Sequence, residues 1–196
     1  MSKKIALALA VATLTGATCA AAQEGPLQVR VRAVQLNASN SDSANLGLSI
    51  NNKMIPEADI SYFITDNIAA ELILTVPQKH DVKLNGAVIG SLKHLPPTLT
   101  VQYHFAPKDS VRPYVGAGLN YTHFSSVNLP AGLSVKSNSY GAAFQAGVDV
   151  QIDKTMFANF DVKKVYIGTD VSSNGAKLTT FKVNPTLIGV GLGWRF

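Results

Sequence analysis

The chain has 196 residues, of which 46% are hydrophobic and 15% are charged, and its formal net charge is +5. This length fits one domain and excludes a large multidomain enzyme, and the apolar fraction is too high for intrinsic disorder. Average soluble domains carry roughly 25% charged residues. The low share here indicates that fewer side chains face water than in a typical soluble protein.

The first 22 residues have the plan of a secretory signal peptide. Two lysines precede a short apolar stretch over 5–14, and three alanines end at Ala22, where we expect cleavage. The apolar stretch is shorter than the roughly 20 residues that a transmembrane helix needs. Cys19, the one cysteine of the sequence, lies in this segment, so we expect neither disulfides nor thiol chemistry in the single domain predicted over 23–196.

From residue 27 onward, apolar and polar residues alternate with the period of two that is typical of β-strands. In one example, Leu99, Val101 and Tyr103 alternate with Thr100 and Gln102. Each alternating run has one apolar face and one polar face. Such runs cover 27–33, 57–64, 69–76, 98–105, 114–121, 141–150, 156–163 and 188–196.

The connections between these runs alternate in length. They are short at 65–67, 106–110 and 153–155, and long and polar at about 37–54, 78–96, 125–138 and 168–181. Short turns at one end and long loops at the other are the plan of an outer-membrane barrel. We therefore predict an all-β fold, an eight-stranded antiparallel transmembrane β-barrel whose interior is just filled by side chains. Its meander has short periplasmic turns and long extracellular loops.

Alternation alone does not decide which face of the barrel points outward. A soluble lipocalin-like carrier has its polar face outside, whereas a membrane barrel has its apolar face outside. The chain ends on Trp194, Arg195 and Phe196, which puts two aromatic residues on the apolar face, where membrane barrels carry aromatic girdles. Glycines also cluster on the polar face, which suits a narrow lumen: Gly116, Gly118, Gly141, Gly147, Gly189, Gly191 and Gly193. Both features favour the membrane barrel.

The polar face carries a balanced set of charges. Buried charges need partners of opposite sign, so five basic and five acidic residues predict a paired network inside the barrel. We interpret this network as structural, since ion-pair networks often stabilise a protein without conducting anything. Its predicted members are Arg30, Arg32, Glu57, Asp59, Glu71, Arg112, Asp149, Asp161, Lys163 and Arg195.

Several segments resemble the OmpW family, and together they cover essentially all of 27–196. They are Pro56–Phe63, Pro96–Phe105, Arg112–Tyr121, Gln145–Asp149 and Gly191–Phe196. The resemblance implies an eight-stranded outer-membrane barrel that is linked to the passage of small hydrophobic molecules.

The last strand is also similar to the signal read by the barrel-insertion machinery, with Gly191, Trp194 and Phe196 at the expected spacing. Two positions depart from the usual pattern. Gly189 stands where that signal usually begins with a polar residue, and Leu27 stands where the first strand of the OmpW family often has Trp. Neither departure affects the predicted fold.

Inward positions near the long-loop end are apolar, whereas the charged set lies at mid-height and toward the short turns. We therefore predict an apolar funnel that is open to the outside above a charged layer. A hydrophobic solute gains roughly 25 cal/mol per Å² of apolar surface buried there, while crossing the charged layer would separate ion pairs. The six funnel residues are Ile55, Phe124, Val165, Ile167, Val183 and Leu187.

The hypothesis for transport is uptake from outside into the funnel, followed by sideways exit into the bilayer between two strands. Pro185 is the candidate lateral opening, because proline has no N–H to donate to a neighbouring strand. The alternative is that Pro185 only marks the end of a strand.

The long loops are basic, which bears on the expected partners. The outer leaflet carries anionic sugar-phosphate lipid, so we expect lipopolysaccharide as a partner in addition to outer-membrane lipid in general. Ordinary solvated lysines are the alternative. No nucleic acid is expected, because no aromatic residues interleave with the lysines. The loop charges are Lys53, Lys79, Lys83, Lys93, Lys136, Lys177 and Lys182 against Asp42, Asp81 and Asp170.

Enzymatic and metal sites find little support. His123 and Ser125 are similar to the His-x-Ser pair of lipid A deacylase barrels, but the glutamate that would complete a triad is missing downstream. His80 and His94 lie at no metal-ligand spacing, and we expect the inward His104 to pair with an acid of the lumen. We predict no catalytic residues, metal or cofactor.

The sequence thus predicts a multi-pass barrel of the Gram-negative outer membrane, a porin-like channel for small hydrophobic molecules and not an enzyme. The alternative is a closed barrel with a structural, stress-response, adhesion or receptor role. A soluble periplasmic carrier ranks third.

Overall fold

The computed structural model describes residues 25–196, and the predicted signal peptide lies outside the described residues. No helix within this range is long and apolar enough to cross a membrane. The fold is all-β. Its strands are β1 (Leu27–Asn37), β2 (Ser41–Asp42), β3 (Leu48–Ile50), β4 (Lys53–Phe63), β5 (Ile68–Thr75), β6 (Gln78–Leu84), β7 (Ala87–Leu95), β8 (Thr98–His104), β9 (Val111–Asn128), β10 (Leu133–Val135), β11 (Asn138–Gln151), β12 (Met156–Val165), β13 (Gly168–Ser173), β14 (Ala176–Lys182) and β15 (Thr186–Arg195).

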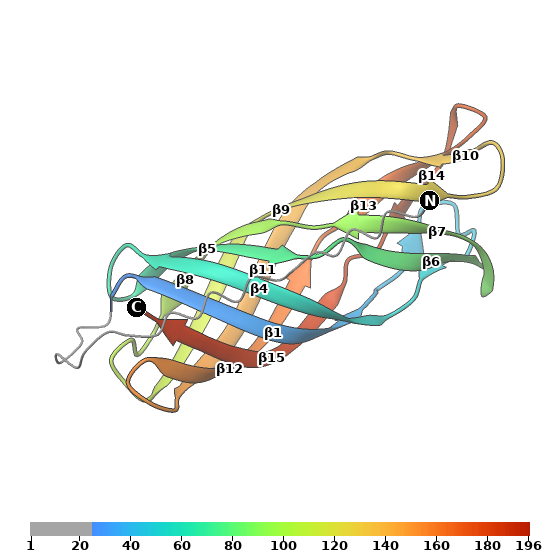
Figure 1. Ribbon diagram of the computed structural model, residues 1–196. Coiled ribbons are helices and arrows are strands. Elements are labelled where there is room, and N and C mark those ends of the chain that lie inside the picture. Colours follow the sequence, from blue (N-terminus) through green and yellow to red (C-terminus); the bar gives the residue numbers. More distant parts are fainter. Residues whose placement is uncertain (1–24) are drawn as a thin grey trace, which may run out of the picture.

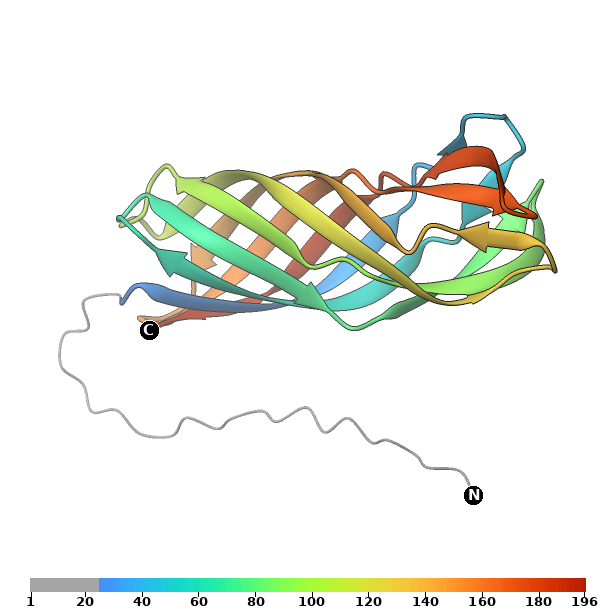
Figure 2. The same ribbon diagram turned by 90° about the horizontal axis from the view of Figure 1, so that it is seen from above.

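Eight of these strands form a closed antiparallel barrel. Strands β1, β4, β5, β8, β9, β11, β12 and β15 pair in chain order, and the barrel closes where β15 pairs with β1. Figures 1 and 2 show the long strands wound obliquely around one axis, with the C-terminus and the short turns at the same end. The predicted eight-stranded barrel is confirmed. We call this end the turn end and the opposite one the hairpin end.

The sequence suggested that the long polar segments are loops. In the structure they contain the shorter strands of the hairpin end. Strands β6 and β7 form a hairpin whose β7 edge continues the barrel wall along the upper half of β9. Strands β10, β13, β14 and β2 form a second, four-stranded sheet. Asn85-Gly86 and Asn174-Gly175, with positive φ at all four residues, make the tight turns that these hairpins require.

The outward face of the barrel is apolar. Val31, Leu99, Val101 and Leu119 are all more than half exposed, and Leu119 reaches 73%. In water this surface would be far larger than the apolar patches that soluble proteins expose. It fits the hydrocarbon of a membrane, and it excludes the soluble carrier considered from the sequence.

Exposed aromatic residues flank the apolar surface at both ends. Tyr121, Tyr140 and Tyr166 lie toward the hairpin end, and Tyr62, Tyr103, Phe105 and Phe196 toward the turn end. Phe105 donates its backbone N–H to Pro113, and the stretch from Pro113 to Tyr121 then rises roughly 20 Å along the barrel axis at usual strand rise and tilt. This is close to the apolar band of about 25 Å in membrane barrels.

The lumen is narrow, and glycines on its wall make room for large side chains. A Cβ atom at Gly193 would overlap the ring of Phe157, and one at Gly147 would overlap the hydroxyl of Tyr114. Both aromatic side chains are almost fully buried. The inward glycines of the sequence are therefore a consequence of a filled barrel.

Candidate functional site

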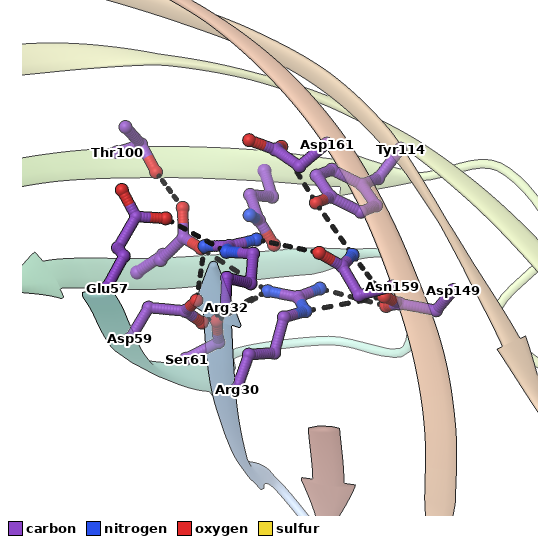
Figure 3. A network of polar contacts seen from close by, with 12 residues as sticks. Arg30, Arg32, Glu57, Asp59, Ser61, Thr100, Tyr114, Asp149, Asn159 and Asp161 are labelled. Carbon is purple, nitrogen blue, oxygen red and sulfur yellow. Dashed lines mark hydrogen bonds and ion pairs between the residues drawn. The ribbon is translucent and has the colours of Figure 1, made fainter. Parts of the chain in front are cut away.

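Arg30 lies at the centre of the charged interior. Its guanidinium contacts three carboxylates, at 2.8 Å from Asp149, 3.2 Å from Asp59 and 3.3 Å from Glu71. These acids come from β11, β4 and β5, so one side chain of β1 connects strands around the lumen (Figure 3). The side chain of Arg30 is inaccessible to solvent.

Arg32 and Lys163 extend the network toward the hairpin end. Arg32 contacts Asp59 and, at 2.9 Å, Glu57, while the Lys163 ammonium lies 2.7 Å from Glu57 and 2.6 Å from Asp161. Neutral side chains complete it. The Tyr114 hydroxyl donates to Asp161 and Thr100 donates to Glu71, and Asn159 connects Arg32 with Asp149.

All ten charged residues predicted for the lumen are buried, none more than 8% exposed. Two arginines lie against aromatic rings: the Arg195 guanidinium is 3.8 Å from the ring centre of Phe63, and that of Arg112 is 5.5 Å from Phe157. A layer of paired charges therefore fills the lumen at mid-height and toward the turn end.

His104 has a different partner from the one we expected. Its Nε2 lies 3.1 Å from Oε1 of Gln102, in place of a lumen carboxylate, and its ring stacks on Tyr114 with 5.1 Å between centres. The alternation of β8 turns both Gln102 and His104 inward, which puts them within reach of one another.

An apolar cluster fills the barrel above the charged layer, and all six funnel residues belong to it. The other buried members come partly from the barrel strands and partly from the strands of the hairpin end, which the sequence treated as polar loops. They are Val34, Leu36, Leu48, Ile50, Val82, Leu92, Ala143, Val171 and Phe181.

The funnel is closed in this structure, so the expectation of an open funnel is wrong for this state. The inner cavity, which touches Leu187 and Ile55, has a volume of about 30 Å³. The outer cavity, next to Phe124 and Phe181, has about 10 Å³. The inner cavity is about the size of one water molecule. Side chains from the strands of the hairpin end fill the space that we had predicted to be an open funnel.

Pro185 lies just before β15 and lines the inner cavity. Its carbonyl accepts the backbone N–H of Val165 at 3.2 Å. Backbone pairing continues beyond this bond, because the N–H of Val183 donates to the carbonyl of Ile167 at 2.9 Å. Asn184 adds to it: its side-chain oxygen accepts the N–H of Ile167, and its carbonyl accepts the ammonium of Lys164. At Pro185 itself the wall lacks only the N–H that proline does not have.

The inner cavity reaches the wall at a second place, which the sequence analysis missed. The pairing of β5 with β8 ends at Ile73 and Thr98, and the cavity is lined there by Leu74, Thr75 and Pro96. Leu74 is also 43% exposed on the outward face. Prolines lie on both sides of this point in the sequence. They could have indicated that the pairing of β5 with β8 ends here, because proline has no backbone N–H to donate to a neighbouring strand.

Two histidines of the β6–β7 hairpin lie together in the apolar cluster. The rings of His80 and His94 stack with 4.7 Å between centres and 9° between planes, and both side chains are buried. The two histidines are far apart along the chain, so the sequence did not indicate this contact. Hairpin pairing puts Gln78 opposite His94, and His80 is the next residue of β6 on the same face as Gln78. Within the described range, no group of three or more His, Cys, Asp or Glu side chains is arranged to hold a metal ion.

Comparison with known proteins assigns this architecture to a family. The model of the OmpW family matches residues 23–196. The chain belongs to the OmpW family. A curated relative of Sinorhizobium fredii, described as an uncharacterized outer-membrane protein, y4mB, is 42% identical over 95% of this chain and 90% of its own. Outer membrane protein W of Vibrio cholerae is 33% identical, with 95% of each chain covered.

The fold of this OmpW-family chain is also similar to that of a solved structure. The crystal structure of the outer membrane protein OprG from Pseudomonas aeruginosa matches with a TM-score of 0.77 at 24% identity, covering 88% of this chain and 97% of that one. The chain is thus an outer-membrane β-barrel, as predicted. We orient it with the hairpin end outside and the turn end in the periplasm, as in other outer-membrane barrels.

Removing Arg30 tests the charge network. Arg30→Met leaves Asp59, Glu71 and Asp149 without their shared partner, and breaking a buried ion pair costs about 3–5 kcal/mol. We expect a large fall in the temperature at which the barrel loses its compact mobility on a semi-native gel. Lys108→Met is the control, because Lys108 pairs with Asp66 on the exposed turn end. Equal midpoints in the two variants would contradict a structural role for the network.

The histidine pair predicts an acid response of the hairpin end, above the girdle of Tyr121. Burial, then the neighbouring charges of His80 and Lys53, lower the pKa of His94 to about 3. The unfolded imidazole has its ordinary pKa near 6.5. Stability from this site is therefore complete above about pH 6.5 and is lost as the pH falls toward 3.

We expect the thermal midpoint of the wild-type barrel to fall between pH 7 and pH 4 by more than that of His94→Phe. The phenylalanine keeps an aromatic ring in the stack but has no proton to bind. A pH response of the same size in both proteins would show that His94 does not contribute to it.

Proposed function

We propose that this barrel takes up small hydrophobic molecules from outside and releases them sideways into the membrane. The observation that carries the proposal is the order of the interior along the axis. The buried side chains at the extracellular end form a large apolar cluster around the pair His80 and His94, and a layer of ion pairs lies beneath it. Membership of the OmpW family supports an outer-membrane barrel with a channel role.

The two layers treat a hydrophobic solute in opposite ways. Contact with the apolar cluster removes apolar surface from water, at roughly 25 cal/mol per Å². The charged layer offers no such gain, because Arg30 and Lys163 would have to leave their carboxylates in a medium of low dielectric constant. The solute is therefore favoured in the upper half of the barrel and is stopped at mid-height.

Passage requires a change from the closed state described here, because cavities of about 30 and 10 Å³ cannot hold an organic molecule. The covering side chains belong to short strands such as β3 (Leu48–Ile50), which has only one paired neighbour in the sheet. Short edge strands open more easily than the continuous barrel wall. We propose that the hairpin end moves while the charged layer stays in place.

Two places in the wall are candidates for the lateral opening, since the inner cavity touches both. One lies at Pro185 between β12 and β15, and the other lies at Leu74 and Pro96 between β5 and β8. Both lie at about the height of the extracellular girdle, because Tyr121 donates its backbone N–H to Pro97, and Val165, next to Tyr166, donates to Pro185. An exit there returns an apolar solute to hydrocarbon without crossing the charge network.

Two partner proposals accompany this function. We propose that the extracellular lysines contact the anionic headgroups of lipopolysaccharide, by charge attraction at the outer leaflet. We also propose that the last strand is read by the barrel-insertion machinery. Trp194 and Phe196 face outward, and Gly191 lies opposite Arg32 on the pairing strand.

A charge in the funnel should stop uptake. Leu187 is buried beside the inner cavity, so Leu187→Asp places a carboxylate where a hydrophobic solute would have to pass. We expect protein-dependent uptake of apolar solutes to be lost while the barrel still folds and migrates as a compact species. Leu178→Asp, at an exposed position of β14, introduces the same charge outside the path and is the control. Unchanged uptake by the Leu187 variant would contradict the proposed path.

Disulfide staples test the lateral exit. Cysteines at Lys164 and Thr186 would join β12 to β15, and cysteines at Ile73 and Thr98 would join β5 to β8, since each pair is in register. We expect oxidation to block uptake in one of the two proteins and reduction to restore it. A staple at Phe160 and Val190, farther down the first seam, is the control. Full uptake with both upper seams oxidised in one protein would exclude exit through either seam.

A further inference from the structure

The two small cavities meet at a polar side chain. His94 lines both the inner and the outer cavity, together with Ile167. Its ring stacks on His80 and lies edge-on to Phe124, with 6.5 Å between the ring centres. A solute moving from the outer to the inner cavity would therefore pass the imidazole of His94.

The Nε2 atom of His94 is buried and has no hydrogen-bond partner within the described structure. The other polar groups of the inner cavity are already paired. Thr98 donates to the carbonyl of Pro96, Asn120 donates to Thr98, and Thr75 donates to the carbonyl of Pro56. Buried polar atoms are nearly always hydrogen-bonded in native proteins, so the unpaired Nε2 beside these cavities is a place where a hydroxyl group, of water or of a solute, would bond.

The neighbourhood of this atom defines the chemistry of the missing partner. The ring nitrogen is either a donor or an acceptor, depending on the tautomer, and a hydroxyl group can serve either state. The remaining lining near it is aliphatic or aromatic, with Ile50, Leu92 and Val183 in the outer cavity. The two charged residues that line the inner cavity, Glu57 and Lys163, are already paired with each other, so a charged partner would find no free counter-ion there.

We propose that His94 is a binding residue for the hydroxyl group of the solute, so that the barrel prefers compact apolar alcohols and phenols over hydrocarbons of the same shape. This inference rests on the proposed function and narrows its substrate class. A hydroxyl buried among aliphatic side chains loses its hydrogen bonds to water, and the imidazole replaces one of them.

Uptake of a matched pair of probes tests the proposal. 1-Naphthol and 1-methylnaphthalene have nearly the same shape and differ in a hydroxyl group against a methyl group. Their uptake is compared in cells that produce the barrel and cells that lack it. For the wild type we expect a naphthol-to-methylnaphthalene ratio of protein-dependent uptake about fivefold to tenfold higher than for His94→Phe, the usual effect of one hydrogen bond.

Two further variants separate hydrogen bonding from packing. His94→Gln retains a hydrogen-bonding group and is expected to recover part of the ratio. His123→Phe removes a histidine that bonds to Asn138 on the exposed face and is expected to leave the ratio unchanged. An equal ratio in the wild type and in His94→Phe overturns the role of His94 while leaving the proposed function intact. No protein-dependent uptake of either probe contradicts the proposed function and this inference with it.

A direct measurement covers the case in which the His94 variants fail to fold. The ¹⁵N resonance of His94 Nε2 is followed in the detergent-solubilised wild-type barrel while each probe is added. We expect 1-naphthol to shift it in a saturable way and 1-methylnaphthalene to leave it nearly in place. No shift with saturating 1-naphthol would overturn the proposal.

Discussion

The contact of Arg30 with carboxylates from three other strands is the interaction on which the rest of the structure depends. One guanidinium contacts Asp149, Asp59 and Glu71 inside a narrow barrel, where glycines on the wall make room for the large side chains of the lumen. Every charge in this layer has a partner, so an ion or a solute that crossed it would have to separate buried ion pairs, at high cost. This cost is the reason why the proposed transport takes place above the layer.

The position of the charged layer explains the chemistry above it. Residues such as Leu187 and Phe124 point into the same lumen as Arg32 but lie nearer the extracellular end, where they form an apolar cluster. A solute that moved inward along the axis would thus first bury apolar surface and would then meet the high cost of separating ion pairs. In the wall beside the cluster, the pairing of β5 with β8 ends just before Pro96, and Pro185 removes one donor between β12 and β15. The lateral exit proposed above uses these two places.

The sequence predicted the barrel well because strand alternation records the inward and outward faces directly. It placed Arg30 and Asp149 on one lumen, and it placed Leu119 on the membrane face. It missed what hairpin pairing brings together. His80 and His94 are distant along the chain but stack in space, and Phe181 fills the funnel from a segment that looked like a polar loop. For the segment of His80 and His94, the Asn85-Gly86 pair was the signal of a tight turn, and therefore of a hairpin.

Whether apolar solutes use the extracellular half of this barrel can be measured as the uptake of a graded series of alkanes and small aromatic compounds, in cells with and without the protein. If they do, uptake is faster with the protein, and the difference increases with the hydrophobicity of the solute. Equal rates across the whole series would contradict the proposed uptake, and would indicate a barrel that stays closed and acts through its extracellular strands.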